Sequence, residues 1–209
     1  MIQNPDLTYE TNLWPHYIHI AGLDEAGRGA LAGPVAVGAV ILPSDEELLA
    51  GTLAGLRDSK QLTPPEREVL TPRIKEVARS WSVGFASAEE IDSDGIVCAT
   101  RLAALRALHG LSISPQYLLT DFRLELPQLD IPQTSLVKGD ALCLSISAAS
   151  VLAKTTRDAF MHELDIHYQG YELGKHKGYG TYAHRSALKR LGISPIHRKS
   201  FQIKEIRIT

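Results

Sequence analysis

Two neighbouring carboxylates, Asp24 and Glu25, stand at the end of an apolar run and directly before a glycine-rich turn. The run, residues 18–23, is typical of a buried strand, and the turn, residues 27–29, reads Gly-Arg-Gly. Acids on a rigid strand end suit a divalent metal ion, because hard cations prefer oxygen ligands that are held in place. A glycine turn lets a nucleic-acid backbone approach the protein backbone closely. The stretch therefore indicates a metal site next to a nucleic-acid contact.

Two further acids follow short apolar segments. Asp121 ends a strand expected at 116–120, and Asp140 follows a strand expected at 135–137. Acids at strand ends converge at one edge of a sheet, where loops open to solvent. Four such carboxylates can hold two Mg²⁺ or Mn²⁺ ions about 4 Å apart, one activating water and the other stabilising the leaving oxygen of a phosphoryl displacement. Because clustered carboxylates repel one another, such a site requires a cation.

The same acids have a structural alternative. Neighbouring side chains on a strand face opposite sides, so Asp24 and Glu25 share a site only if the strand ends between them or one reaches in from the flank. Taken singly, Asp24, Asp121 and Asp140 are ordinary turn residues, and Glu25 is a solvated acid at a helix start. The metal-site interpretation therefore depends on the whole set.

The composition is that of a globular protein. The chain has 209 residues, of which 44% are hydrophobic and 22% charged. We expect residues 1–16 to be a loosely attached tail and residues 17–209 to form a single domain, with a helical element from about residue 170. The N-terminus does not have the pattern of a secretory leader, and no apolar run approaches ~20 residues. We therefore expect a cytoplasmic protein without membrane contact.

The two cysteines, Cys98 and Cys143, each lie in an apolar helical pattern. Both are predicted to be buried thiols, and neither indicates a disulfide framework or a zinc site.

Charge is distributed unevenly along the chain. The formal net charge is -2, with 22 Lys and Arg against 24 Asp and Glu. Residues 138–209 carry 12 basic against 6 acidic residues, a net of +6, which leaves the remainder with 10 against 18, a net of -8. A basic C-terminal third favours contact with nucleic acid, and the alternative is a chance imbalance on a solvated face.

The order of the expected elements indicates an α/β fold with a mixed sheet. A capping box of Thr63 and Glu66, with Pro64 at the first helical position, begins one of the helices. The expected strands are 17–24, 34–42, 81–87, 116–120 and 135–137, and the expected helices are a short one within 43–63, then 64–79, 88–91, 95–109, 142–168 and 181–191.

Five segments, in this order, resemble ribonuclease HII, the type 2 ribonuclease H: GLDEAGRGALAGPVAVGAV, RDSKQLTP, KGDALCLSISAASVLAKTTRD, HKGYGT and SPIHRKSF. The resemblance runs from about residue 18 to 201. It implies a ribonuclease H-like mixed β-sheet flanked by helices, with a C-terminal helical element. It also implies hydrolysis of the RNA strand of RNA–DNA hybrids and nicking 5′ to single ribonucleotides in duplex DNA, with 5′-phosphate and 3′-hydroxyl products.

The resemblance assigns the catalytic metal ligands to Asp24, Glu25, Asp121 and Asp140. The third acid of the family usually precedes a glycine, whereas Phe122 follows it here. Asp158 is also a family feature, and its place inside an expected helix favours a supporting role. The implied cofactors are two ions of Mg²⁺ or Mn²⁺, and the sequence does not choose between them.

The resemblance also assigns substrate contacts. The turn of Gly27, Arg28 and Gly29 matches the family's sensor of the ribonucleotide 2′-hydroxyl, the group that separates RNA from DNA. Tyr179 matches a tyrosine that packs on the neighbouring sugar and would clash with a 2′-hydroxyl there. Ala30 stands where the family usually has proline. Without the resemblance, the alternatives are a simple tight turn and a core tyrosine, the latter less favoured because the flanking glycines and lysine are typical of a surface loop.

Several further residues are expected to contact the substrate backbone. Small residues at 147–150 are predicted to allow close packing of a helix against the sheet, with a hydroxyl near the site as the minor alternative. Three histidines, at 176, 184 and 197, are expected to have surface or structural roles, the last two with phosphate contact as an alternative. The candidates for phosphate contact are Ser59, Lys60, Lys154 and Arg157, followed by Lys138, Lys175, Lys177 and Arg198.

Rival functions are a DNA nuclease or resolvase on the same fold, a non-catalytic hybrid-binding module, and a metal-dependent phosphatase of small molecules. The first would cleave all-DNA substrates, the second would lack a carboxylate, and the third would not need a basic C-terminal third. The expected partners are RNA–DNA hybrid and ribonucleotide-containing duplex DNA. The C-terminal FQIKEIRIT shows no aromatic pair for a sliding clamp, and we expect a monomer.

Overall fold

A five-stranded mixed sheet forms the centre of the molecule in a computed structural model that describes residues 4–57, 59–121 and 124–201. The strand order is β3-β2-β1-β4-β5. β1 pairs antiparallel with β2 and parallel with β4, β2 pairs antiparallel with β3, and β4 pairs parallel with β5. The strands are β1 (Ile20–Ala26), β2 (Val35–Ile41), β3 (Ser80–Ala86), β4 (Tyr117–Asp121) and β5 (Gln133–Leu136).

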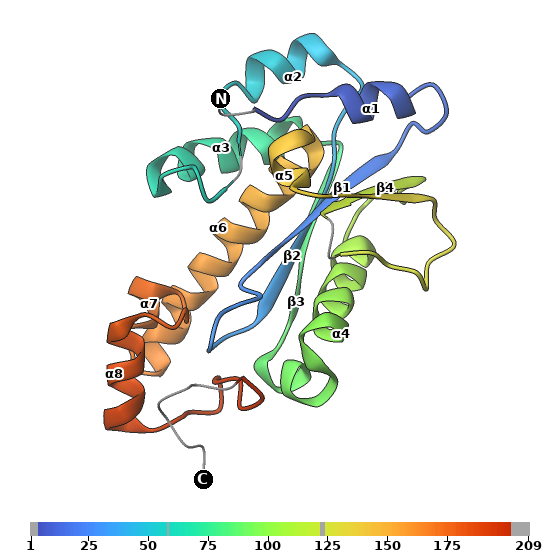
Figure 1. The fold of residues 1–209 in the computed structure, drawn as a ribbon. Coiled ribbons are helices and arrows are strands. Elements are labelled where there is room, and N and C mark those ends of the chain that lie inside the picture. The colour runs from blue at the N-terminus through green and yellow to red at the C-terminus, as the bar shows by residue number, and fades with distance from the viewer. Residues whose placement is uncertain (1–3, 58, 122–123, 202–209) are drawn as a thin grey trace.

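Two long helices cover the two faces of this sheet (Figure 1). Helix α6 (Leu144–His167) packs across β1 and β2, and helix α4 (Ala88–His109) packs across β2 and β3 on the other face. Because both faces are covered, β2 is buried along its whole length, and β1 at all but one residue. The prediction of an α/β fold with a mixed sheet is confirmed.

Glycines on the strands let α6 approach the sheet closely. A Cβ on Gly22 would lie 2.3 Å from the backbone of Ser145, and one on Gly38 would lie 2.3 Å from the carbonyl oxygen of Ala149. The small residues predicted at 147–150 therefore do provide close packing. This contact fixes α6 relative to β1, which carries two of the candidate ligands.

Local sequence signals begin the helices as expected. Helix α3 (Pro64–Val77) starts with the capping box of Thr63 and Glu66. Helix α4 is interrupted at Gly95, whose φ of 79° and ψ of 159° are not helical, so it consists of two helical segments joined by a kink, as the sequence predicted. The remaining helices are α1 (Thr8–Leu13), α2 (Glu46–Thr52), α5 (Gly139–Leu142), α7 (Leu173–His176) and α8 (Tyr182–Leu191).

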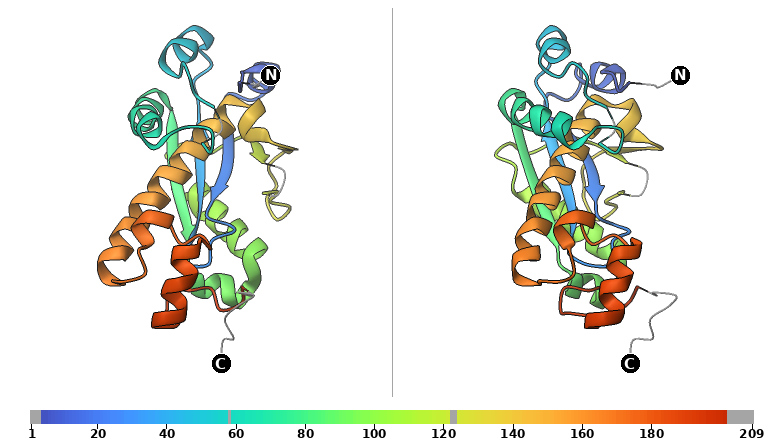
Figure 2. Two further views of the ribbon diagram at one scale, coloured as in Figure 1. Left: turned by 60° about the vertical axis from the view of Figure 1, so that its left-hand side comes forward. Right: turned by 90° about the vertical axis from the view of Figure 1, so that its left-hand side faces the viewer.

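The first and last described segments of the chain lie at opposite ends of the molecule (Figures 1 and 2). Helices α1 and α2 lie near the N-terminus, whereas α7 and α8 lie together beside the last turns of α6. This second group is the C-terminal helical element expected from about residue 170. It packs through its own apolar cluster, which includes Met161, Tyr171 and Leu188.

Residues 4–16 are not the loose tail that was expected. Asp6 accepts a hydrogen bond from the Leu144 backbone and donates to the Leu142 carbonyl. Glu10, on α1, is buried, and its Oε1 accepts from the Ser145 backbone at 2.8 Å. A carboxylate at the first turn of α6 supplies an acceptor for N–H groups that have no partner within the helix. The polar sequence of this segment concealed that role.

One of the two cysteine predictions is also wrong. Cys143 is buried, as expected, but Cys98 is exposed on α4. Over the described part of the chain, we find no helix with the length and hydropathy that a membrane span requires.

Candidate active site

Three acids meet where β1 and β4 end at the same edge of the sheet. The two strands are paired in parallel from Ile20 to Leu23 on β1, so their carboxyl ends point the same way. Asp24 and Glu25 come next on β1, and Asp121 is the last residue of β4. One carboxylate oxygen from each of the three lies within 4.8 Å of the others. We call Asp24, Glu25 and Asp121 the acid cluster.

The end of the β1–β4 ladder explains how two neighbouring strand residues reach one site. The ladder stops at Leu23 and Thr120, while β1 continues beside β2 to Ala26. Past Leu23 the described residues provide no ladder partner on that side of β1. Asp24 and Glu25 therefore both border an open edge, although their side chains leave the strand in opposite directions.

Asp140 lies beside the acid cluster rather than within it. It is on α5, just after β5, and its charge acts on Asp24. Its Oδ2 is 3.4 Å from Lys60 Nζ. The backbone N–H of Gly139 donates to Asp121 Oδ1 at 2.9 Å, which ties α5 to the end of β4. The structure thus brings the four predicted ligands to one edge of the sheet, three of them as a close set.

Burial and like charge make the acid cluster unfavourable without a cation. Asp24 is 4% exposed, and burial, followed by the charge of Glu25, raises its pKa well above the ordinary value. Burial also raises the pKa of Glu25, although Arg28, 3.7 Å away, acts in the opposite direction. Asp24 Oδ2 and Glu25 Oε2 are buried and have no hydrogen-bond partner among the described residues. Unpartnered carboxylate oxygens in a like-charged cluster fit a divalent cation.

A hydroxyl pair and a buried arginine support this edge. The Ser150 hydroxyl donates to Ser59 Oγ at 2.8 Å, and its closeness to Asp24 opposes the rise in the pKa of that carboxyl. Ser150 therefore has the site role that the sequence favoured less, and Ser59 is buried within the network. Arg67 donates through Nη1 to the carbonyls of Ser59 and Leu62. Its position holds the segment that carries Lys60, and nothing in the sequence signalled it.

The glycine turn needs its glycines for two different reasons. Gly27 has a φ of 84°, and a Cβ there would lie 1.9 Å from Arg157 Nε. Gly29 has open space around it, so another molecule can approach its backbone. Ala30, in the position where proline was noted for the family, donates its N–H to the Gly27 carbonyl at 3.2 Å. Proline has no such donor.

Tyr179 faces the same cleft from the loop between α7 and α8. Its ring is 36% exposed, and Lys154 Nζ lies 5.8 Å from the ring centroid. Lys154 is oriented by Asp158, whose Oδ1 is 2.7 Å from Nζ. Asp158 thus has the supporting position expected of it. The exposed ring excludes the alternative of a core tyrosine.

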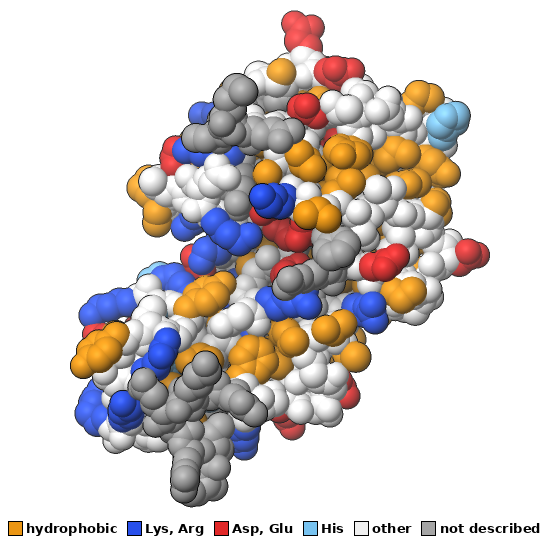
Figure 3. All heavy atoms as spheres, in the orientation of Figure 1, with side chains coloured by type: hydrophobic (Ala, Val, Ile, Leu, Met, Phe, Trp, Pro, Cys, Tyr) orange, Lys and Arg blue, Asp and Glu red, His pale blue; other side chains and the backbone are white. Residues whose placement is uncertain are grey.

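The active-site cleft is a hollow of about 520 Å³. In Figure 3 acidic side chains occupy the middle of this face and Lys and Arg side chains border them. Most of the predicted site residues line the cleft, and Asp140 and Arg157 lie beside it. The lining residues are Asp24, Glu25, Ala26, Gly27, Arg28, Gly29, Ser59, Lys60, Arg67, Asp121, Lys154 and Tyr179.

The predictions of phosphate contact by Arg157 and Arg198 are wrong. Both side chains are buried, and their guanidinium groups donate to backbone carbonyls. Arg198 binds the carbonyls of Gly33 and Arg28 at 3.0 and 2.8 Å. Arg198 therefore stabilises the glycine turn from the protein interior and does not reach the solvent.

The remaining basic candidates differ in their surroundings. Lys138 is exposed next to α5, Lys175 pairs with Glu172, and Lys177 contacts His162.

The three histidines of the C-terminal third considered above, His176, His184 and His197, form a buried group.

The rings of His176 and His184 stack at 4.3 Å, and His184 Nε2 is 3.1 Å from His197 Nε2. Their role is structural, and phosphate contact by His184 or His197 is excluded by burial.

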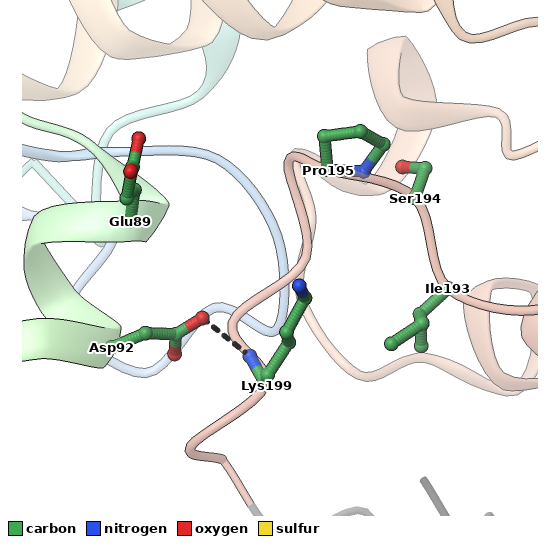
Figure 4. Close-up of a pocket in the computed structure, with 6 residues that line it drawn as sticks. All are labelled: Glu89, Asp92, Ile193, Ser194, Pro195 and Lys199. Atoms are coloured by element: carbon green, nitrogen blue, oxygen red, sulfur yellow. Dashed lines mark hydrogen bonds between the residues drawn. The ribbon is translucent and has the colours of Figure 1, made fainter. Parts of the chain in front are cut away.

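A second cavity, of about 500 Å³, lies between α4 and the segment after α8 (Figure 4). Glu89 and Asp92 face Ile193, Pro195 and Lys199 across it. Asp92 accepts hydrogen bonds from the backbones of Lys199 and Ser200, which fastens the C-terminal segment to α4. This cavity contains none of the acid cluster, so the chemistry belongs to the cleft at the strand ends.

A mixed sheet with buried acids at its parallel strand ends and a basic rim defines a metal-dependent phosphodiester hydrolase. The family model described as ribonuclease HII matches residues 21–204. The chain belongs to the ribonuclease HII family. It is therefore an endoribonuclease with metal-dependent ribonuclease H activity.

Curated relatives share about half of their aligned residues with this chain. Ribonuclease HII of Desulfitobacterium hafniense strain Y51 is 53% identical over 196 residues, which cover 93% of this chain and 73% of that protein. Ribonuclease HII of Dehalococcoides mccartyi (strain ATCC BAA-2266) is 50% identical over 198 residues, which cover 94% and 92%.

Solved structures show the same fold. Ribonuclease H2 of Pyrococcus horikoshii OT3 has a TM-score of 0.71 at 27% identity, covering 88% of this chain and 94% of that one. Ribonuclease HII in the PCNA complex from Archaeoglobus fulgidus has a TM-score of 0.74 at 24% identity, covering 91% and 98%. These likenesses confirm the ribonuclease H-like architecture. The expectation that the chain has no clamp motif concerns its C-terminus, where residues 202–209, like Phe122, lie outside the described residues.

Proposed function

We propose that this enzyme nicks duplex DNA on the 5′ side of a single embedded ribonucleotide and also cleaves the RNA strand of RNA–DNA hybrids. The observation that carries the proposal is that the glycine turn and Tyr179 line the same cleft as the acid cluster. One element suited to a 2′-hydroxyl and one suited to a sugar ring thus lie beside the metal-binding acids. A ribonuclease that cut any RNA strand would need only the acids and the basic rim.

Asp24, Glu25 and Asp121 would hold the divalent cation, and Asp140 would complete the set from the rim. A cation bound there activates water and stabilises the leaving oxygen. Mg²⁺ and Mn²⁺ both suit carboxylate ligands, and we propose two ions of either. The expected products are a 5′-phosphate and a 3′-hydroxyl.

The protein's own groups would select and hold the substrate. The open backbone at Gly29 allows a sugar to approach, and the polar groups of the turn can both donate to and accept from a 2′-hydroxyl. The exposed ring of Tyr179 offers a surface for the adjacent sugar, where a second 2′-hydroxyl would collide with it. Lys60 and Lys154, which both line the cleft, would contact phosphates.

The rival functions fit the cleft less well. An all-DNA nuclease has no use for a sensor of the 2′-hydroxyl, and a binding module has no use for buried carboxylates without partners. A small-molecule phosphatase does not need several basic residues around its cleft. The biological role that follows is removal of misincorporated ribonucleotides and clearance of RNA primers by a cytoplasmic monomer.

The test is cleavage of a labelled duplex with one ribonucleotide, beside an all-DNA duplex of the same sequence, with Mg²⁺, Mn²⁺ or chelator. We expect a metal-dependent cut 5′ to the ribonucleotide and no cut in the control. Equal cleavage of both duplexes would replace the proposal with a DNA nuclease. Salt-sensitive binding without any cleavage would indicate the binding module.

A further inference from the structure

Arg157 connects the two elements that the proposed function assigns to the substrate. Its guanidinium, on α6, is fully buried. Nε donates to the Pro34 carbonyl at 2.8 Å and Nη2 to the Ala32 carbonyl at 3.2 Å, both in the segment that follows the glycine turn. Nη1 donates to the Lys177 carbonyl at 2.9 Å, two residues before Tyr179. One rigid side chain therefore holds both segments.

The two segments also contact each other directly around this side chain. The backbones of Leu31 and Ala32 donate to the Gly178 carbonyl at 2.8 and 3.3 Å. A Cβ on Gly178 would lie 2.3 Å from the Ala32 carbonyl oxygen. Arg157 Cζ is 5.6 Å from the centroid of the Tyr179 ring. The guanidinium thus lies between the turn and the tyrosine with little room for movement.

Arg157 holds backbone segments through hydrogen bonds and does not form an ion pair. Within the described parts of the chain, no carboxylate lies within ion-pair distance of its guanidinium. Burial lowers its pKa, while the charges of Tyr179 and Asp158 act in the opposite direction, and the groups that accept its hydrogen bonds are backbone carbonyls. A planar guanidinium directs several donors at fixed angles, which an ammonium cannot do.

We propose that Arg157 is a positioning residue that sets the spacing between the glycine turn and Tyr179, and thereby the preference for an RNA–DNA junction. This inference rests on the proposed function. A junction presents a 2′-hydroxyl on one sugar and none on the next, so discrimination requires that both contacts be made at once. A change in this spacing would leave the acid cluster in place, but the glycine turn and Tyr179 could no longer contact neighbouring sugars at the same time.

The experiment is a double-mutant cycle on the substrate preference, defined as kcat/KM for a single-ribonucleotide duplex divided by kcat/KM for a continuous RNA–DNA hybrid. The variants are Arg157→Lys, Tyr179→Ala and the double variant. We expect Arg157→Lys to lower the preference about 10-fold in the native background. In the Tyr179→Ala background the same change should alter it by less than about twofold, because the contact that Arg157 positions is already gone.

Arg106→Lys is the matched control. Arg106 also donates to a backbone carbonyl, that of Phe85, but it forms an ion pair with Glu90 and is not among the residues that line the active-site cleft. The Arg106→Lys substitution should lower the thermal midpoint of unfolding without changing the substrate preference. If Arg157→Lys does not fold, Arg157→Gln takes its place, because a neutral amide is less costly to bury than an unpaired ammonium.

Two results would overturn the inference. One is an unchanged preference in the folded Arg157 variant, and the other is an effect of the same size with and without the Tyr179 ring. Either could occur while the native enzyme still prefers the single ribonucleotide, and then only the inference fails. If the native enzyme shows no dependence on the ribonucleotide, the proposed function itself fails.

Discussion

The acidic side of the active-site cleft and the side that carries the glycine turn both bury charge, but they compensate it differently. Asp24 and Glu25 retain carboxylate oxygens without partners, so their charge is left for a ligand to neutralise. Arg157 is satisfied by backbone carbonyls of the protein itself. The first arrangement is built to bind a cation, and the second to hold backbone in place. Chemistry and recognition therefore depend on separate sets of residues that meet at one cleft.

Removal of one carboxylate should have the largest effect. We expect Asp24→Asn to reduce kcat by about 10³-fold or more, since the metal ligand set would be incomplete. The same substitution should stabilise the metal-free protein, because burial and the charge of Glu25 both disfavour the ionised Asp24.

Cleavage assays and thermal unfolding of the metal-free protein measure the two effects. Loss of both activity and stability would show that Asp24 is a structural acid, and the contrast between the two sides would not hold.

Metal addition should have the next largest effect. At a free Mg²⁺ or Mn²⁺ concentration 100 times its Kd, binding to the folded state alone contributes about 2.7 kcal/mol. The thermal midpoint should therefore rise by several degrees for a chain of this length. Calorimetry of the native protein and Asp24→Asn, with and without chelator, provides the measurement. An equal rise in both proteins would place the cation elsewhere.

The recognition side should respond to acid through its buried histidines. Burial and the charge of His176 lower the pKa of His184 to about 4, whereas an unfolded histidine titrates near 6.5. Between these pH values His184 binds a proton in the unfolded chain but not in the folded one. Its titration therefore lowers the free energy of unfolding of the protein as pH falls, by at most about 1.4 kcal/mol per pH unit.

Urea unfolding across this pH window, compared with His184→Gln, isolates the contribution. Asp24 raises the stability of the protein as pH falls, because its folded-state pKa is raised. Both proteins in the comparison contain Asp24, so its contribution cancels. A slope that His184→Gln leaves unchanged would contradict the assignment.

The acids were predictable from sequence because a strand end is a local feature. An apolar run followed by a carboxylate places that carboxylate at a sheet edge, and parallel pairing brings Asp24 and Asp121 together. The capping box at Thr63 likewise depends on residues three apart. The sequence could not show where the β1–β4 ladder ends, and so left open how Glu25 joins the cluster.

The supporting residues were not predictable because their partners are distant in the chain and carry no side-chain signature. Arg157 reaches the carbonyl of Pro34, 123 positions away, and any residue supplies a carbonyl. Glu10 binds the Ser145 backbone 135 positions away. In each case a charged residue in a polar or helical pattern indicates exposure, whereas the fold buries it.

The central claim is that chemistry and recognition depend on separate sets of residues. Its most direct test is a comparison of Asp24→Asn with Tyr179→Ala. For each, kcat/KM is measured on the single-ribonucleotide duplex and on the continuous hybrid. The account predicts that Asp24→Asn lowers both values by the same factor, while Tyr179→Ala lowers the first about 10-fold more than the second, as loss of one stacking contact would. An equal loss on both substrates in Tyr179→Ala would contradict it.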